Sequence, residues 1–462
     1  MNCSDERKIF EVVNPASEKV IGRFEGMTRE EMWEAVDQSH GTWLKWRRTG
    51  FGERSRLLKK AGALLSERAE EYGRLITAEM GKTFRSAVAE VQKCAWVCDY
   101  YAEHAEDFLA EEAVLTDAEE SFVTCQPIGT VLAVMPWNFP FWQVFRFAAP
   151  ALMAGNAALL KHAGNVPGCA RVIEGVFREA GYPENLFRSL LICSGWVEEL
   201  LEHKYIAAAT LTGSGPAGSA VASKAGEMLK KTVLELGGSD PYVILEDADL
   251  AEAASVCAAS RLINNGQSCI AAKRFIVVEE VSEEFTRLFA AEMKKAVMGD
   301  PMDDHVTLGP LAREDLRDEL HDQVHRSVSA GARLLMGGEI PGQKGYWYPP
   351  TVLTGVTPGM AAFDEELFGP AAAIITAQDE KEAVELANRS IFGLGAAVFT
   401  RDIRRGRRIA AEELEAGSCF VNQMVSSDPR LPFGGIKASG YGRELSRPGI
   451  REFTNIKTVS VK

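Results

Sequence analysis

The chain is best understood from two short segments, Val233-Leu-Glu-Leu-Gly-Gly238 and Asn265-Gly-Gln-Ser-Cys269. The first places a carboxylate, Glu235, among apolar residues and glycines, a setting typical of a general base. The second places Cys269 after small and amide residues, a setting typical of a nucleophile. Taken singly, the cysteine is equally compatible with core packing and the glutamate with a salt-bridged strand. Together they predict that a thiolate adds to a carbonyl and that a nearby base activates water to release the acyl group.

Composition limits the classes of protein to consider. The chain has 462 residues, 46% of them hydrophobic and 25% charged, with a net charge of −14. This length predicts two or three domains. The acidic balance argues against nucleic acid or an anionic membrane surface as partner, although a local arginine could still bind an anionic substrate. There is no apolar run of about 20 residues and no apolar signal segment at the N-terminus, so we expect no membrane span.

The nine cysteines are scattered without a paired framework, which favours reduced thiols and a cytoplasmic location. Cys94 and Cys98 lie one helical turn apart with no histidine nearby, and core packing is the simpler interpretation. His321 and His325 share the same spacing within a charged stretch and indicate a solvated helix face. We therefore expect no metal site.

The order of apolar segments predicts an α/β fold. Long amphipathic helices come first, for example 54–72 and 86–108. Two regions of alternating strand and helix follow, which is typical of open parallel sheets. The expected strands of the first region are 130–135, 157–161, 188–193, 207–211 and 233–236, with a helix at 167–180. Those of the second are 242–245, 275–278, 372–376, 396–399 and 418–421, and 335–355 is expected to form loops around a short strand.

A glycine-rich segment, Thr212-Gly-Ser-Gly-Pro-Ala-Gly218, follows an expected strand and opens an expected helix. Its spacing lets backbone amides meet a pyrophosphate at a helix N-terminus. Alone the motif is weak, because a plain turn has the same composition. It also lacks an acidic residue about 20 positions further on, where Lys230 and Lys231 stand.

Three further motifs extend the pattern: Pro136-Trp-Asn-Phe-Pro140, Glu365-Glu-Leu-Phe-Gly-Pro370 and Pro432-Phe-Gly-Gly-Ile-Lys-Ala-Ser-Gly440. With the first two segments, they make the chain resemble the aldehyde dehydrogenase superfamily from Asn14-Pro15 to the final strand. Several segments, including Lys161-His-Ala163, are similar to a short bacterial subgroup of succinate-semialdehyde dehydrogenases.

The resemblance implies a fold and a set of roles. The fold would combine a Rossmann-like parallel-sheet cofactor domain, a second α/β catalytic domain and a small β oligomerisation element. Cys269 would be the nucleophile, Glu235 the base, and Asn138, with the Cys269 amide, would hold the oxyanion. The presence of Glu235 weighs against CoA-acylating relatives, which lack this base. The cofactor, NAD or NADP, would contact Trp137, Lys161, Gly213, Ser214, Gly218, Leu236, Glu366 and Phe368; Glu366 would bind the nicotinamide ribose.

The choice of aldehyde depends on arginines. Arg146 stands where the succinate-semialdehyde branch has a carboxylate-binding arginine, whereas Ile263 replaces that branch's second arginine. Arg261 would face elsewhere. We expect Arg430 to substitute and to hold a substrate carboxylate together with Arg146. The alternative is a broad-range enzyme acting on neutral aliphatic or aromatic aldehydes, in which both arginines are structural.

The cofactor choice depends on Gly164. Many NAD-using relatives carry a glutamate at this position, which binds the adenosine ribose. Its absence removes repulsion against a 2′-phosphate and leaves Lys161 free to bind it, so we expect NADP to be accepted.

The resemblance also implies domain boundaries. Residues 1–111 and 127–238 would form the cofactor domain, 239–427 the catalytic domain, and 428–446 a return segment lining the substrate funnel. Residues 112–126 and 447–462 would be oligomerisation strands, because 121–126 and 458–461 resemble strands that need a partner edge. We expect a homodimer or homotetramer.

Overall fold

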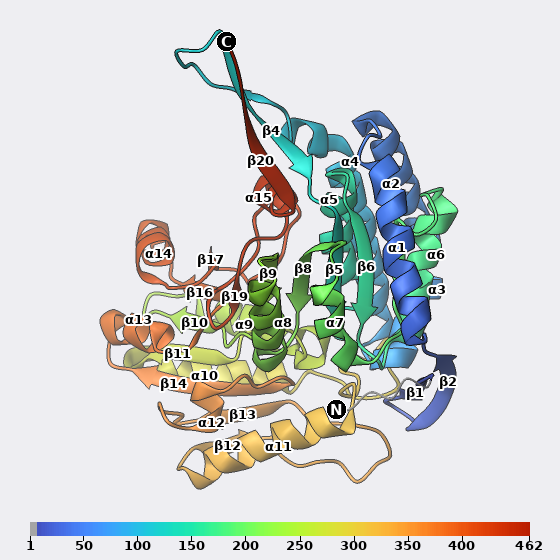
Figure 1. The fold of residues 1–462 in the computed structure, drawn as a ribbon. Helices are drawn as coiled ribbons and strands as arrows, with labels where there is room; N and C mark the ends of the chain where they lie inside the picture. The colour runs from blue at the N-terminus through green and yellow to red at the C-terminus, as the bar shows by residue number, and fades with distance from the viewer. Residues whose placement is uncertain (1–6) are drawn as a thin grey trace.

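The computed structural model describes residues 7–462, and its first large sheet carries the glycine-rich segment (Figure 1). Its strand order is β19-β9-β8-β5-β6-β7, parallel except for β19. The bounds are β5 (Thr130–Met135), β6 (Ala157–His162), β7 (Phe187–Ser189), β8 (Ile206–Thr212), β9 (Lys231–Glu235) and β19 (Gly440–Tyr441). This is the cofactor-type sheet that the sequence predicts.

Alternation along the strands gives this sheet two buried faces. Val131 and Ala133 belong to one core, whereas Leu132 between them belongs to another. The first core is covered by α2 (Phe51–Glu67), α3 (Ala69–Met80), α4 (Phe84–Phe108), α5 (Trp142–Met153) and α6 (Pro167–Ala180). The second is covered by α1 (Arg29–Trp46), α7 (Val197–Glu202) and α8 (Gly215–Glu227).

The second large sheet has the order β12-β13-β14-β11-β10-β16-β17 and is parallel except for β12. Its strands are β10 (Pro241–Ile244), β11 (Arg274–Val278), β12 (Arg333–Met336), β13 (Thr351–Thr354), β14 (Ala371–Ala377), β16 (Gly395–Phe399) and β17 (Ser418–Val421). Helices α9 (Leu250–Leu262) and α10 (Glu279–Met293) cover one face; α11 (Glu314–Ser329), α12 (Ala361–Asp364) and α13 (Glu380–Asn388) cover the other.

Smaller elements complete the chain. Strands β4 (Glu120–Pro127) and β20 (Thr454–Val461) pair antiparallel, and together they project from the body with the C-terminus at their far end (Figure 1). The others are β1 (Ile9–Asn14), β2 (Lys19–Glu25), β3 (Glu112–Ala113), β15 (Phe392–Gly393), β18 (Ile436–Lys437), α14 (Ile403–Arg408) and α15 (Ser446–Arg451).

Most expected elements are confirmed, and two are wrong. The ranges of β5, β17 and α6 match the prediction, but the helix expected over 54–72 is broken at Arg68, where φ is −108° and ψ is 24°. The strand expected over 188–193 ends at Ser189, because Leu191 leaves the sheet and its carbonyl accepts from the Met27 N–H at 2.8 Å. The hairpin of β1 and β2 was not expected.

The cysteines largely follow expectation. Seven are free, and Cys94 and Cys98 are fully buried in the first core, which confirms the packing interpretation for this pair. Cys193 is disulfide-bonded, so the expectation of reduced thiols throughout is wrong for this residue.

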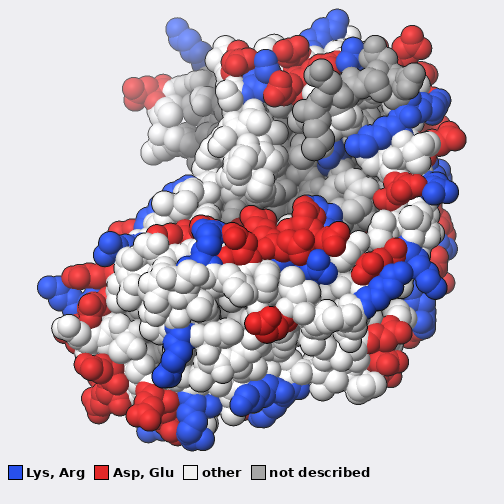
Figure 2. Space-filling model, turned by 90° about the horizontal axis from the view of Figure 1, so that it is seen from below, with Lys and Arg blue, Asp and Glu red and all other residues white. Residues whose placement is uncertain are grey.

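Charged side chains are distributed over the surface in mixed groups. On the face seen in Figure 2, basic and acidic residues alternate, and acidic side chains gather in a band across the middle. Within residues 7–462 no helix combines the length and the apolar character that a membrane crossing requires.

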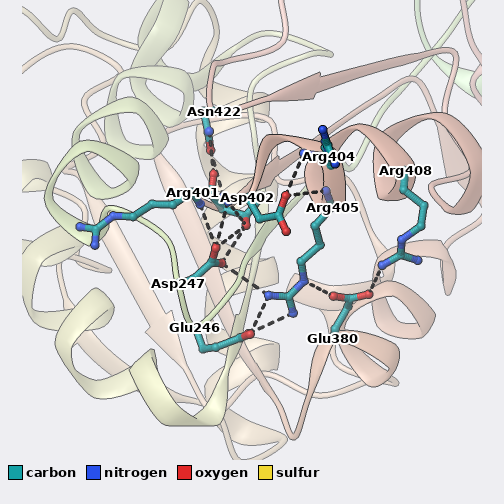
Figure 3. Close-up of polar contacts among 10 residues, drawn as sticks. Glu246, Asp247, Glu380, Arg401, Asp402, Arg404, Arg405, Arg408 and Asn422 are labelled. Atoms are coloured by element: carbon teal, nitrogen blue, oxygen red, sulfur yellow. Dashed lines mark hydrogen bonds and ion pairs between the residues drawn. The ribbon is translucent and has the colours of Figure 1, made fainter.

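One ionic network ties α14 to its neighbours (Figure 3). Arg405 binds Glu246 at 2.6 Å, forms an ion pair with Asp247 at 3.5 Å and pairs with Glu380 from α13. Asp402 caps α14 by accepting from the Arg404 and Arg405 N–H groups. The network therefore joins α14 to α13 and to the segment that follows β10.

Candidate active site

The loop that carries Cys269 is shaped by three consecutive residues in the left-handed region. Asn264, Asn265 and Gly266 have φ values of 54°, 58° and 75°. Asparagine and glycine tolerate this region better than other residues. A Cβ at Gly266 would lie 2.2 Å from the carbonyl carbon of Gly369, so only glycine fits. The sequence Asn-Asn-Gly therefore turns the chain sharply between α9 and the cysteine.

Buried side chains hold this loop in place. The Asn265 side-chain amide donates to the carbonyls of Gly81 and Pro310 at 3.1 and 3.0 Å. Arg261 donates to the carbonyls of Gly266 and Ala272 at 2.6 and 2.8 Å. Arg261 thus faces away from the substrate, as expected, and serves the backbone of the nucleophile loop.

Lys273, for which the sequence analysis had no role, anchors the cysteine itself. Its ammonium is fully buried and donates to the carbonyls of Ser268 and Cys269 at 2.8 and 2.6 Å. It also lies 3.5 Å from Glu366. One lysine therefore links the nucleophile loop to the glutamate assigned to the cofactor ribose.

Two cavities meet at Cys269, which stands in the walls of both together with Gln143. The first, of about 300 Å³, has a largely apolar wall with Phe139, Trp142 and Phe433. We call it the aldehyde cavity. The second, of about 570 Å³, includes in its wall Asn138 and the predicted cofactor residues Trp137, Gly213, Ser214, Leu236, Glu366 and Phe368. We call it the cofactor cleft. A thiol at this junction can contact two bound molecules at once.

The thiol is held in its neutral form in this state. Burial raises the pKa of Cys269 to about 12, against the opposing influence of Lys273 and Arg146. The nucleophile therefore requires a proton acceptor or a change in its surroundings before it can attack.

Glu235 has the character of such an acceptor. It ends β9, is 2% exposed, and within residues 7–462 neither of its carboxylate oxygens has a hydrogen-bond partner. Burial raises the pKa of Glu235 to about 8, opposed by the charge of Arg146. The carboxylate lies beside Gly434, where a Cβ would be 2.9 Å from Oε1, and it is in the wall of neither cavity.

Asn138 is buried in the wall of the cofactor cleft, beside the cysteine loop. Its Nδ2 donates to the Gln267 carbonyl at 3.1 Å, and the Asn264 side chain donates to the Asn138 carbonyl at 2.8 Å. Gln267 accepts only one of the two Nδ2 hydrogens, so the amide retains a donor for an oxyanion.

The cofactor cleft fits a dinucleotide. Gly213 and Ser214 precede α8, whose N-terminal N–H groups and dipole favour a pyrophosphate. Gly218 lies within α8 and permits close packing, since a Cβ there would lie 2.5 Å from Leu236 Cδ2. Trp137 and Phe368 meet edge to face at 5.8 Å in the same wall. The N–H groups at the start of α8 suit the pyrophosphate of NAD or NADP. The aromatic rings and the one carboxylate suit the nicotinamide and its ribose.

Lys161 stands apart from this cleft wall, at the end of β6. Burial, with a smaller contribution from Lys8, lowers the pKa of Lys161 to about 8. No ion pair is present for it within residues 7–462. A buried, uncompensated cation beside Gly164 suits an added phosphate.

Arg146 reaches the aldehyde cavity but already has a partner. It forms a buried ion pair with Glu444 and stacks over the Phe433 ring at 4.7 Å. Among the described residues, its buried Nη2 has no hydrogen-bond partner. Ile263 lines the same cavity, as expected where the second arginine is missing.

The structure places Arg430 elsewhere than we expected. Its guanidinium is 66% exposed, binds Asp428 through two hydrogen bonds of 2.9 and 2.6 Å, and lies over Trp96. It is outside the wall of the aldehyde cavity, whereas Ser426 and Ser427 of the same loop are inside it. Because Asp428 captures the guanidinium, we do not assign Arg430 to a substrate carboxylate.

The polar cavity residues that were not assigned from sequence include Glu90, Lys93, Gln143 and Ser427. Lys93 belongs to α4 and donates a hydrogen bond to Ser427, 334 residues further along the chain. No local motif predicts this contact. The one available signal was a lysine next to Cys94, on the buried side of an amphipathic helix.

The fold and the site together define an oxidoreductase that uses a dinucleotide. The family model for the aldehyde dehydrogenase family matches residues 2–459, and the chain belongs to this family.

Named relatives agree with this assignment. The chain is 49% identical to a probable NADP(+) succinate-semialdehyde dehydrogenase of Synechocystis sp., covering 97% of this chain and 98% of that one. It is 47% identical to the NAD(P)+ succinate semialdehyde dehydrogenase Sad of Escherichia coli, covering 97% and 96%. The solved succinic semialdehyde dehydrogenase of Streptococcus pyogenes with NADP+ superposes with a TM-score of 0.96 at 37% identity, covering 98% and 99%.

Proposed function

We propose that this protein oxidises succinate semialdehyde to succinate, with NADP or NAD as the hydride acceptor. The observation that carries the proposal is the junction of the aldehyde cavity and the cofactor cleft at Cys269. The names of the relatives at 47–49% identity support the choice of substrate.

The reaction begins when the Cys269 thiol gives its proton to the Glu235 carboxylate, which passes it on to solvent before the later hydrolysis. The Cys269 Sγ then adds to the aldehyde carbon, and the carbonyl oxygen becomes an oxyanion. The side-chain amide of Asn138 donates to this oxygen, because Gln267 accepts only one of its two hydrogens. Lys273 fixes the backbone of Cys269 throughout, so the nucleophile does not need to be repositioned.

A dinucleotide held by Gly213, Ser214 and Glu366 would supply the hydride acceptor, and loss of hydride from the thiohemiacetal carbon would leave a thioester on Cys269. Glu235 then takes a proton from water, and the resulting hydroxide attacks the thioester carbon. The C–S bond breaks and releases succinate, and the proton returns to the thiolate or to solvent. The absence of a hydrogen-bond partner for the Glu235 carboxylate fits this role.

Arg146 supports an acidic substrate, since the residue lines the aldehyde cavity and its buried Nη2 has no hydrogen-bond partner among the described residues. One observation favours the alternative, an enzyme for neutral aldehydes: Glu444 already compensates the charge of Arg146. The two functions differ only in whether the aldehyde cavity binds a substrate carboxylate more tightly than a neutral group.

We also propose a homo-oligomeric, cytoplasmic enzyme divided at the boundaries given above. The projecting pair β4 and β20 supports oligomerisation, because Ile456 and Val461 on β20 are exposed. Seven free cysteines within residues 7–462 support a reducing compartment, whereas the disulfide-bonded Cys193 does not.

The test compares initial rates of purified protein on succinate semialdehyde and butyraldehyde, each with NADP and with NAD. These aldehydes differ mainly in the terminal carboxylate. A strong preference for the semialdehyde supports the proposal, and equal kcat/KM values would favour the neutral-aldehyde alternative.

A further inference from the structure

The charges in the wall of the aldehyde cavity are unequally compensated. Three residues with charged side chains line it: Glu90, Lys93 and Arg146. Glu90 is bound by Lys82 at 2.5 Å, and Arg146 is paired with Glu444. Within residues 7–462, no carboxylate lies within ion-pair distance of Lys93. The cavity therefore carries one uncompensated positive charge, and it belongs to Lys93.

The ammonium of Lys93 is held in a defined position. It donates to Ser427 Oγ at 2.8 Å and lies 4.3 Å from the centre of the Trp142 ring. Because Ser427 accepts this hydrogen bond, its own hydroxyl hydrogen is free to donate. Lys93 and Ser427 thus present two kinds of donor side by side in the cavity wall, one from α4 and one from the loop before Phe433.

We propose that Lys93, with Ser427 beside it, binds the carboxylate of the substrate and replaces the arginine that is missing at Ile263. This inference rests on the proposed function and names the group that selects the acidic aldehyde. Arg146 then contributes one donor, whereas Lys93 contributes the net charge.

The surroundings of Lys93 favour an anion there. Burial, followed by the charge of Arg146, lowers the pKa of Lys93 to about 8, while Cys94, Asp428 and Glu90 act in the opposite direction. A bound carboxylate would stabilise the charged form of Lys93, since a buried cation gains more from a close anion than an exposed cation does. Arg430, captured by Asp428 outside the cavity, cannot supply this charge.

The experiment compares K93M, which keeps an unbranched side chain but removes the charge, with K93R, which keeps the charge. The matched control is K59M, because Lys59 is exposed on α2 and pairs only with Glu103. The readout is the ratio of kcat/KM for succinate semialdehyde to kcat/KM for butyraldehyde. Thermal unfolding of each variant shows whether it is folded.

We expect K93M to lower the ratio at least tenfold, mainly through KM for the semialdehyde, and K93R to recover most of it. K59M leaves the ratio at the wild-type value. Succinate, as a competitor of butyraldehyde oxidation, should inhibit K93M at least tenfold more weakly. If Lys93 were purely structural, K93M would lower kcat/KM for both aldehydes equally and leave the ratio unchanged.

The outcomes separate the two proposals. A wild-type enzyme without preference for the semialdehyde would overturn the proposed function and this inference with it. A wild-type preference that K93M retains, with unchanged inhibition by succinate, would overturn the inference alone.

Discussion

Arg146 and Glu444 form an ion pair inside the protein, with only 2% and 6% of their side chains exposed. The pair joins α5 to the C-terminal segment beside Glu235, whose pKa both residues influence. Its main consequence is structural, because a charge in this environment needs its partner.

Replacing Glu444 by glutamine removes one partner and leaves Arg146 uncompensated in the interior. We expect E444Q to lower the free energy of unfolding by about 3–5 kcal/mol. Chemical denaturation measures this change. E53Q is the control, because Glu53 pairs with Arg56 on the surface and should leave the midpoint unchanged. Equal midpoints for E444Q and wild type would contradict the structural role.

Glu235 predicts the pH dependence of turnover. Its base form is the ionised carboxylate, and burial raises its pKa to about 8. The base therefore accumulates as the pH rises through about 8, and kcat should rise with it where hydrolysis limits the rate. E235Q should lower kcat by about 100-fold or more and abolish the rise. Rates measured from pH 6 to 9.5 decide this, and a flat wild-type profile would contradict it.

The network around Arg405 predicts a stability effect far from the site (Figure 3). Arg405 contacts three carboxylates while its side chain is 23% exposed. We expect R405M to lower the free energy of unfolding by about 1–3 kcal/mol, with kcat unchanged. R404M is the matched control, because in Figure 3 only the backbone N–H of Arg404 joins the network.

The pH dependence of this effect has a definite sign. Hydrogen bonds from Arg405 and Thr400 lower the pKa values of Glu246 and Asp247 despite partial burial. A lowered carboxyl pKa adds stability above the ordinary range of carboxyl groups, and this stability is lost as the pH falls through the folded-state values. The gap between wild type and R405M should therefore shrink in acid.

The candidate catalytic residues could be named from the sequence because each lies in a contiguous motif, and their roles stay predictions. Cys269 and Glu235 are recognisable from their immediate neighbours, and the alternation of apolar strands predicted most of both sheets. The Asn-Asn-Gly turn before Cys269 is visible in the sequence. The need for glycine at its third position becomes clear only when Gly369 is seen packed against Gly266.

The walls of the aldehyde cavity could not be predicted in the same way. Lys93 and Ser427 meet only after the helical layer has packed against the loop before Phe433. Arg430 was assigned from its closeness in sequence to Phe433, but Asp428, two residues away, offered a stronger partner. Where several charges compete, the pairing depends on three-dimensional distances that a linear motif does not contain.

The cofactor preference follows from a single position. Gly164 follows β6 and Lys161, and it lacks the glutamate that would repel a 2′-phosphate. G164E should lower the ratio of kcat/KM for NADP to kcat/KM for NAD at least tenfold, about 1.4 kcal/mol at 25 °C.

Size must be separated from charge in this test, because a Cβ at Gly164 would lie 3.2 Å from the Phe10 ring. G164Q adds nearly the same volume without the negative charge. If electrostatic repulsion is the cause, G164Q keeps most of the NADP activity that G164E loses, and the difference shrinks as ionic strength rises. Equal losses in the two variants would show that the space beside Phe10, and not the missing carboxylate, admits the phosphate.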